Sequence, residues 1–190
     1  MYQNEELCIK NVDFCITNDG FCSSLVQLEG TQSVPVTDVI LANITFAHTA
    51  ETFMNSYEVP SGGDYAIHRN GAVRFQGTER STVAGCVFDR SGGNGMVLSD
   101  YNRNATVERN SFRKLGDSAI VLVGSADLID ATGGDQPRFT TIAENTAYEY
   151  GLIGKQVAAV FQAVSCQTTI RDNIFFSGPR HGINFNVRAT

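Results

Sequence analysis

The sequence contains no tryptophan and only four prolines among its 190 residues, and charged residues make up just 18% of it. A low charged fraction combined with 18 glycines is typical of a turn-rich globular chain, not of a disordered one. Lysine and arginine number 14 against 20 for aspartate and glutamate, so the formal net charge is -6 at pH 7. Nucleic acids are bound through a concentrated basic field, and this balance therefore argues against them as partners.

Long apolar runs are also missing, so the sequence predicts no membrane span. The first residues, MYQNEELCIK, lack the apolar stretch and cleavage site of a secretory signal, and we expect no signal peptide. Five cysteines are present, and the spacing of seven between Cys8, Cys15 and Cys22 is foreign to zinc sites. A chain of this length is expected to form one domain, residues 1–190.

A short motif recurs along the chain. TVERNSF (106–112) returns as TIAENTA (141–147) and TIRDNIF (169–175), and STVAGCVF has the same outline. Each copy is followed by a short apolar segment: GMVLS, AIVLV, AAVFQ or GINFN. The second residue of the motif recurs at Val83 and Val107, which are 24 residues apart. Aligning Met96, Ile120, Ala159 and Ile183 as equivalent predicts later repeats with insertions of 4 and 11 residues.

A fixed period in this range indicates a solenoid. The repeat has no leucine-dominated frame and no helical segment, and both of its segments alternate with period two, so a parallel β-helix is favoured over a leucine-rich repeat. We therefore predict an all-β fold of about 24 residues per coil. Asn110, Asn145 and Asn173 are predicted to stack at one corner, where they would satisfy backbone groups. Phenylalanines are predicted to stack inside, at positions 88, 112 and 175.

The repeat is regular over residues 71–187 and less regular over residues 1–70, where IKNVDF and ILANITF are expected to be faint earlier coils. The last predicted strand, GINFN, stops in mid-coil with no capping helix after it. We therefore expect a segment of a longer β-helix, present as a monomer or as part of a longer chain.

The run GGNGMVLSDYNRNATVERNSFRKLGDSAIVLVG, together with GDQPRFTTIAEN and GPRHGINFN, resembles the right-handed parallel β-helix proteins of the pectate-lyase-like superfamily. It looks most like uncharacterised eukaryotic proteins that carry this domain. The resemblance implies a right-handed solenoid, a polysaccharide or glycan as partner, and a location outside the cell. The same scaffold also serves in non-catalytic adhesive and structural proteins.

Alternation within the strands predicts which side chains face outward. If Leu98, Leu122, Phe161, Ile183 and Phe185 face inward, one outward row is Val97, Val121, Val160 and Asn184, and the next is Ser99, Val123, Gln162 and Asn186. Polar residues cluster before the strands, at Asp117, Lys155, Gln156, Arg180 and His181. Insertions near this cluster would build loops beside it.

Two chemistries remain open at this cluster. A lyase or epimerase needs a base and a cation that neutralises the uronate, for which Lys155 and Arg180 are candidates. A glycoside hydrolase needs two carboxylates. Asp117 is one candidate, and the candidates for its partner are Asp100, Glu149 and a residue beyond the end of this sequence. The predicted catalytic residues are Asp117, Lys155, Arg180 and His181, and the predicted substrate-binding residues are Tyr101, Arg103, Gln156, Gln162, Asn184 and Asn186.

No cofactor is predicted. Asp127, Asp130 and Asp135 share a glycine-rich stretch and are candidate oxygen ligands for Ca²⁺, although three such acids are more often simply solvated. The alternatives to an enzyme are a glycan-binding or structural β-helix and an inactive fragment.

Overall fold

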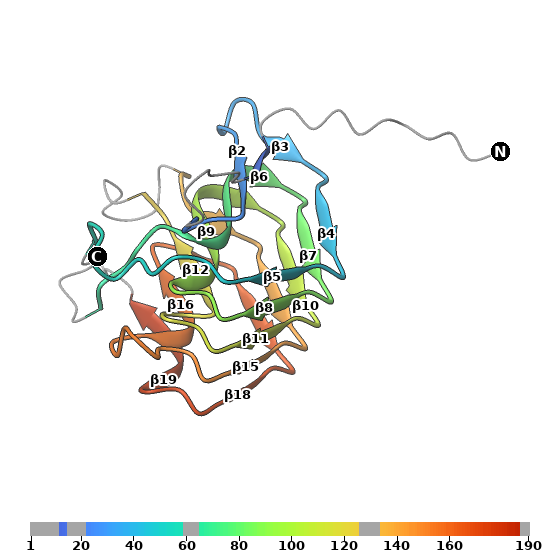
Figure 1. Ribbon diagram of the computed structural model, residues 1–190. Helices are drawn as coiled ribbons and strands as arrows, with labels where there is room; N and C mark the ends of the chain where they lie inside the picture. The colour runs from blue at the N-terminus through green and yellow to red at the C-terminus, as the bar shows by residue number, and fades with distance from the viewer. Residues whose placement is uncertain (1–11, 15–21, 59–64, 126–133, 187–190) are drawn as a thin grey trace.

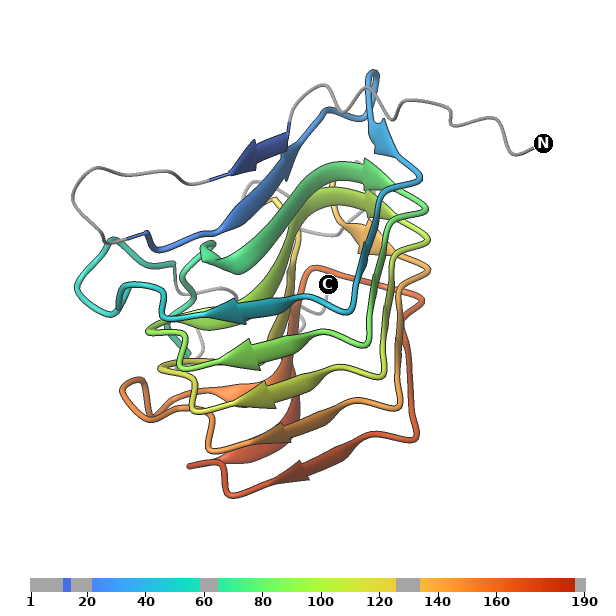
Figure 2. The same cartoon turned by 45° about the vertical axis from the view of Figure 1, so that its right-hand side comes forward.

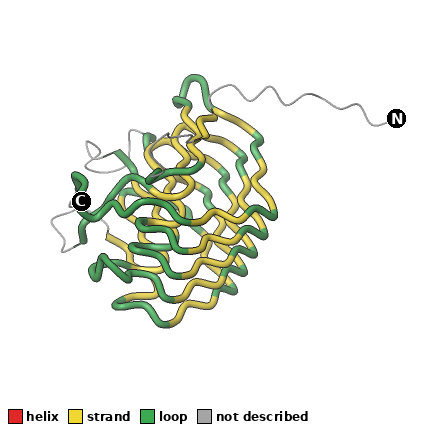
Figure 3. The backbone as a smooth tube through the Cα atoms, in the orientation of Figure 1, coloured by secondary structure: helices red, strands yellow, loops and turns green. Residues whose placement is uncertain are grey.

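The computed structural model describes residues 12–14, 22–58, 65–125 and 134–186. Every regular element among these residues is a β-strand, and the strands are joined by turns and loops (Figure 3). They stack as successive coils in three sheets, which Figures 1 and 2 show as the faces of one solenoid. The all-β parallel solenoid predicted from the sequence is confirmed.

The first sheet, sheet A, has nine strands: β1 (Val12–Phe14), β2 (Val26–Glu29), β6 (Gly71–Glu79), β9 (Asn94–Arg103), β12 (Ile120–Val123), β16 (Ala158–Ala163) and β19 (His181–Asn186), in that order, with β3 (Val36–Thr37) beside β6 and β13 (Pro137–Arg138) beside β9. Sheet B consists of β4 (Ile40–Ala42), β7 (Thr82–Ala84), β10 (Thr106–Glu108), β14 (Thr141–Ala143) and β17 (Thr169–Arg171). Sheet C consists of β5 (Thr45–Ala47), β8 (Val87–Asp89), β11 (Ser111–Arg113), β15 (Thr146–Tyr148) and β18 (Ile174–Phe176).

The register of sheets B and C follows the motif. Val107 pairs with Val83 on one side and with Ile142 on the other, and Ile142 pairs with Ile170. Leu41 of β4 continues the same column, so ILANITF is a coil as predicted. IKNVDF is not, because β1 pairs antiparallel with β2 and does not continue the parallel stack.

The predicted asparagine ladder is present at the corner between sheets B and C. Asn145 Oδ1 accepts from the backbone N–H and the side-chain Nδ2 of Asn110, both at 3.0 Å. Asn173 Oδ1 accepts in the same way from Asn145, at 2.8 and 3.0 Å. Each Nδ2 also donates at 2.9 Å to a carbonyl of the previous coil, at Val83, Val107 and Ile142. The asparagines thus satisfy a turned backbone that has no sheet partner.

The interior is a column of apolar side chains. Phe88 and Phe112 are fully buried and stack with ring centroids 4.5 Å apart and planes inclined by 12°. Phe46 packs on Phe88 from the coil above, at 5.1 Å. The predicted column is interrupted once, because Ala147 lies between Phe112 and Phe175.

One register prediction is wrong. Val160, and not Ala159, pairs with Ile120 and Ile183, so every later residue of β16 lies one place from its predicted position. Phe161 therefore belongs to the outward row with Val121 and Asn184, while Val160 faces inward. The outward-facing side chains of β16 are also apolar and buried. The strand therefore lacks the alternation of polar and apolar residues from which its register could be predicted.

Candidate functional site

The middle of the outward face of sheet A is covered. Tyr65 and Ile67 pack over Val97, Val121 and Phe161, and all five side chains are buried. The Tyr65 ring lies 5.2 Å from that of Phe161. Open space on this face therefore lies beside Tyr65 and Ile67, not beneath them.

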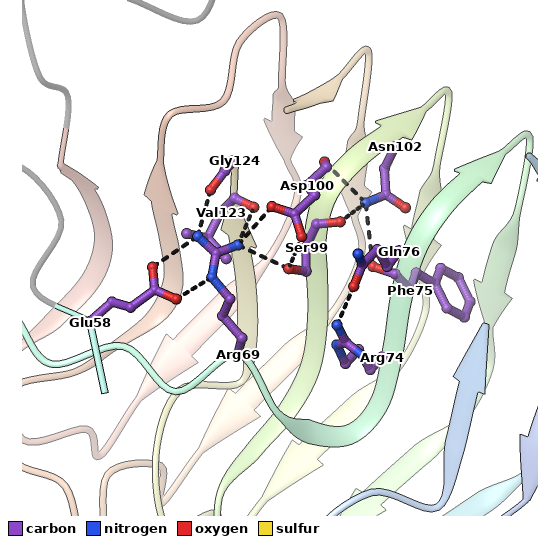
Figure 4. Close-up of polar contacts among 10 residues, drawn as sticks. All are labelled: Glu58, Arg69, Arg74, Phe75, Gln76, Ser99, Asp100, Asn102, Val123 and Gly124. Carbon is purple, nitrogen blue, oxygen red and sulfur yellow. Dashed lines mark hydrogen bonds and ion pairs between the residues drawn. The ribbon is translucent and has the colours of Figure 1, made fainter. Parts of the chain in front are cut away.

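Arg69 forms the centre of a polar network on this face (Figure 4). Its Nε and Nη2 donate to the two carboxylate oxygens of Glu58, at 2.5 and 2.9 Å. Its Nη1 donates to Ser99 Oγ at 2.9 Å and to Asp100 Oδ1 at 3.1 Å, and Nη2 reaches the carbonyl of Gly124 at 2.7 Å. Burial lowers the pKa of Arg69, but the carboxylates of Glu58, Asp100 and Asp135 outweigh it, so the net pKa is raised and the guanidinium stays charged.

A cleft of about 500 Å³ opens next to this network. Its lining is predominantly polar and comprises Gly30, Thr31, Gln32, Gln76, Gly77, Asp100, Tyr101, Ser125 and Asp135. The strands bend here: the pairing of β6 with β9 shifts register between Gln76 and Thr78, and Gly77 and Asp100 have φ values of 64° and 57°. Such an irregularity turns side chains out of the regular alternation, which brings Asp100 and Tyr101 to the same cleft.

Arg103 holds the loop that carries Asp135. Its Nη2 donates to the carbonyl of Gly134 and its Nη1 to that of Gln136, both at 2.5 Å. The guanidinium also lies 4.2 Å above the ring of Tyr101, whose hydroxyl donates to Glu79 at 2.5 Å. The predicted substrate-binding residues Tyr101 and Arg103 thus lie together, Tyr101 in the lining of the cleft and Arg103 behind it.

Asp117 lies elsewhere and is buried. Thr52 Oγ1 donates to its Oδ2 at 3.2 Å, and the backbone amide of Gly154 also donates to the carboxyl. Burial raises the pKa of Asp117, and the nearby His68 and these hydrogen bonds offset only part of that rise. A carboxyl with a raised pKa can act as a proton donor. The pocket nearest to Asp117, lined in part by its neighbours Thr52 and His68, has no carboxylate in its described lining that could act as the second group.

This burial predicts a pH-dependent effect on stability. Because the folded pKa of Asp117 is raised, its contribution to stability is fully present below the ordinary value of 3.8 and is lost as the pH rises through the folded pKa. Asp117→Asn removes the charge but keeps the bond to Thr52, whose hydroxyl can accept. We expect the variant to match the wild type near pH 3.5 and to melt about 2–4 °C higher at pH 7. Calorimetry across this range measures the difference, and a constant offset would contradict it.

Arg180, His181 and Gln156 form a cluster at the amino-terminal end of β19. The Tyr65 hydroxyl and His181 Nδ1 are hydrogen-bonded, and the two rings are stacked with centroids 6.1 Å apart. The guanidinium carbon of Arg180 lies over the Tyr65 ring, 5.0 Å from its centroid. The Arg180 guanidinium also donates a hydrogen bond to the side-chain oxygen of Gln156. These predicted site residues lie together, but their contacts anchor Tyr65.

The remaining predicted residues are dispersed. Lys155 Nζ donates to the carbonyls of Gly151 and Leu152, both at 2.8 Å, and so closes its own turn. Gln162 was predicted to face outward, but the shifted register pairs it with Leu122 and Phe185 of the inward row, and it is buried. Asn184 and Asn186 do lie in outward rows, paired with Phe161 and Ala163.

No group of three or more His, Cys, Asp or Glu side chains in the described ranges is placed to hold a metal ion. Asp127 and Asp130 lie outside those ranges, whereas Asp135 lines the cleft. The described part of the chain also contains no helix long and apolar enough to cross a membrane.

Parallel strands stacked coil upon coil, with an internal asparagine ladder, define a parallel β-helix protein. The family model described as "Right handed beta helix region" matches residues 9–135, which is more than half of the chain, and the protein belongs to that family. Among curated proteins none matches the sequence.

A solved structure named "Glycoside hydrolase" superposes with a TM-score of 0.63 at 15% sequence identity. The match covers 86% of this chain and 39% of the solved one, so this chain spans about two fifths of that structure's length. At this level of identity the likeness shows the fold alone.

Proposed function

We propose that the protein binds a polysaccharide in the cleft beside Asp100 and hydrolyses a glycosidic bond there. The observation that carries the proposal is that two carboxyl side chains, Asp100 and Asp135, line one open polar cleft together with the aromatic side chain of Tyr101. Hydrolysis of a glycosidic bond needs two such groups, one to protonate the leaving oxygen and one to stabilise the positive charge or activate water. The amides of Gln32 and Gln76 supply further hydrogen bonds for sugar hydroxyls.

The contacts of the two carboxyl groups suggest different roles. Asp100 already accepts hydrogen bonds on both oxygens, from Arg69 at 3.1 Å and from Ser99 at 2.9 Å. It is therefore suited to remain a carboxylate, as nucleophile or base. Asp135 lies on the loop that Arg103 holds through the carbonyls of Gly134 and Gln136. Since Asp100 takes the role of the carboxylate, Asp135 is the acid of the cleft lining that donates a proton to the leaving oxygen.

Hydrolysis is favoured over elimination by the contacts of the basic candidates. A lyase needs a basic side chain directed at the substrate and a cation for the uronate carboxylate. Lys155 is bound to two backbone carbonyls, and Arg180 lies over Tyr65. Neither residue lines the cleft.

The test is release of reducing ends from a panel of neutral and uronate polysaccharides. Asp135→Asn and Asp100→Asn are each expected to lower kcat by about a hundredfold or more, because each removes one member of the acid–base pair. Asp172→Asn, an exposed acid on the opposite side of the coil, is the control and should be unaffected. Full activity in both cleft variants would contradict the assignment.

A glycan-binding protein without catalysis is the second candidate. It is favoured by the engagement of Asp100 in the ion pair with Arg69, which fixes the carboxylate as part of the binding surface. In that case the wild type would bind a polysaccharide from the panel, both variants would bind it more weakly, and none of the three would release reducing ends.

An extracellular location remains part of the proposal. Cys22 is disulfide-bonded, and disulfides persist mainly in oxidising compartments outside the cytosol. Mass spectrometry of the protein from culture medium and from cells tests this location directly.

A further inference from the structure

A second pocket, of about 230 Å³, lies on the same face of sheet A. Its lining includes Gln27, Thr52, Asn55, Ser56, His68 and Arg74, and it also includes Arg69. Since Arg69 bonds Asp100 of the cleft, one guanidinium connects the two spaces. None of the catalytic roles proposed above uses this pocket.

One residue that lines the pocket carries an unsatisfied polar atom. Only 8% of the His68 surface is exposed, and its Nδ1 has no hydrogen-bond partner among the described residues. A buried ring nitrogen without a partner is costly, and a shift of the ring that brought Nδ1 to a ligand hydroxyl in the pocket would relieve that cost. The neighbouring Asn55 and Ser56 side chains are exposed and add an amide and a hydroxyl at the rim.

The charges around the two spaces disfavour an anionic ligand. Arg69 is paired with Glu58 and Asp100, and Arg74 is paired with Glu29 at 2.6 Å. Asp135 adds a fourth carboxylate, whereas the guanidinium groups near the two spaces are those of Arg69, Arg74 and, behind the cleft, Arg103. A uronate or sulfated sugar would meet net negative charge, whereas a neutral sugar would not.

We propose that this pocket is a second sugar subsite, which holds a neutral residue of the same oligosaccharide that occupies the cleft beside Asp100. This inference rests on the proposed function. It adds the class of sugar that is bound and the direction in which the glycan crosses sheet A. Gln27 in the pocket and Gly30 in the cleft lie three residues apart along one extended segment, which spans roughly 10 Å. The glycan therefore runs along the strands and passes Arg69, instead of running from coil to coil.

Titration calorimetry with neutral oligosaccharides of one to six residues tests this arrangement, using β-1,4-linked glucose, xylose and mannose series. In the series that binds, affinity is expected to rise about tenfold or more once the ligand is long enough to reach His68. His68→Ala and Asn55→Ala should each remove most of that rise and leave the affinity of the shortest binding ligand unchanged. Asn55 is exposed, so its variant tests the contact without disturbing the core.

Gln32→Ala in the cleft is the matched comparison and should weaken binding at every length. Equal affinities of His68→Ala, Asn55→Ala and wild type at all lengths would overturn the second subsite and leave the proposed function standing. Failure of every oligosaccharide to bind the wild type would overturn the proposed function itself. Tighter binding of oligogalacturonides than of any neutral series would overturn the assignment of a neutral sugar.

Discussion

Replacing Phe112 with alanine is expected to lower the free energy of unfolding by about 4 kcal/mol, because it deletes a fully buried ring and leaves a cavity in the column. The ring stacks on Phe88 at 4.5 Å, and Ala147 on the other side is too small to fill the space. For a chain of this size the expected decrease in melting temperature is about 10 °C. Circular dichroism during heating measures it.

Phe176→Ala is the matched control. This ring also stacks on an aromatic neighbour, Tyr148, at 5.0 Å, but it is 49% exposed on the outside of the coil. Its loss should cost less than about 1 kcal/mol. Similar losses for Phe112→Ala and Phe176→Ala would show that the interior column does not dominate stability.

Asn145→Ala is expected to lower the free energy of unfolding by about 3 kcal/mol or more. The substitution leaves the buried backbone N–H of Asn110 and the carbonyl of Val107 without their side-chain partners, and each such loss costs about 1–3 kcal/mol. Denaturant titration followed by circular dichroism measures the change.

Asn173→Ala tests the same ladder at its last rung. Asn173 is only half-buried, so water can replace part of what its side chain supplies. The expected loss is smaller than for Asn145→Ala. If the two variants lost equal stability, burial would not be what makes the ladder important.

The stacking of coils could be predicted from the sequence because the physical demands repeat. Asn110, Asn145 and Asn173 recur at the turn between sheets B and C, because each side chain there satisfies backbone groups of the neighbouring coil. The register of β16 could not be predicted, since AAVFQA is apolar at every position up to Gln162. Phe161 looks like an interior residue in the sequence, but Tyr65 buries it on the outer face.

The cleft was largely missed for a related reason. Arg69 and Glu58 come from the irregular segment between β5 and β6, and their partners Ser99 and Gly124 lie in different coils. These residues are not separated by the repeat length, so the repeat in the sequence does not reveal that they are neighbours. The sequence identifies Tyr101 by its aromatic character, Asp100 only as one possible partner of Asp117, and Asp135 only as a candidate cation ligand. The length of the segment before Asn70 was the one available signal that a loop covers this face.

A crystal structure of Asp135→Asn with a bound neutral tetrasaccharide would show directly whether the cleft beside Asp100 holds the glycan. We expect a sugar residue in the cleft between Asp100 and position 135, stacked near Tyr101, with the glycan continuing past Arg69 toward His68. A glycan bound beside Arg180 and His181 instead, or an empty cleft at saturating ligand, would contradict it.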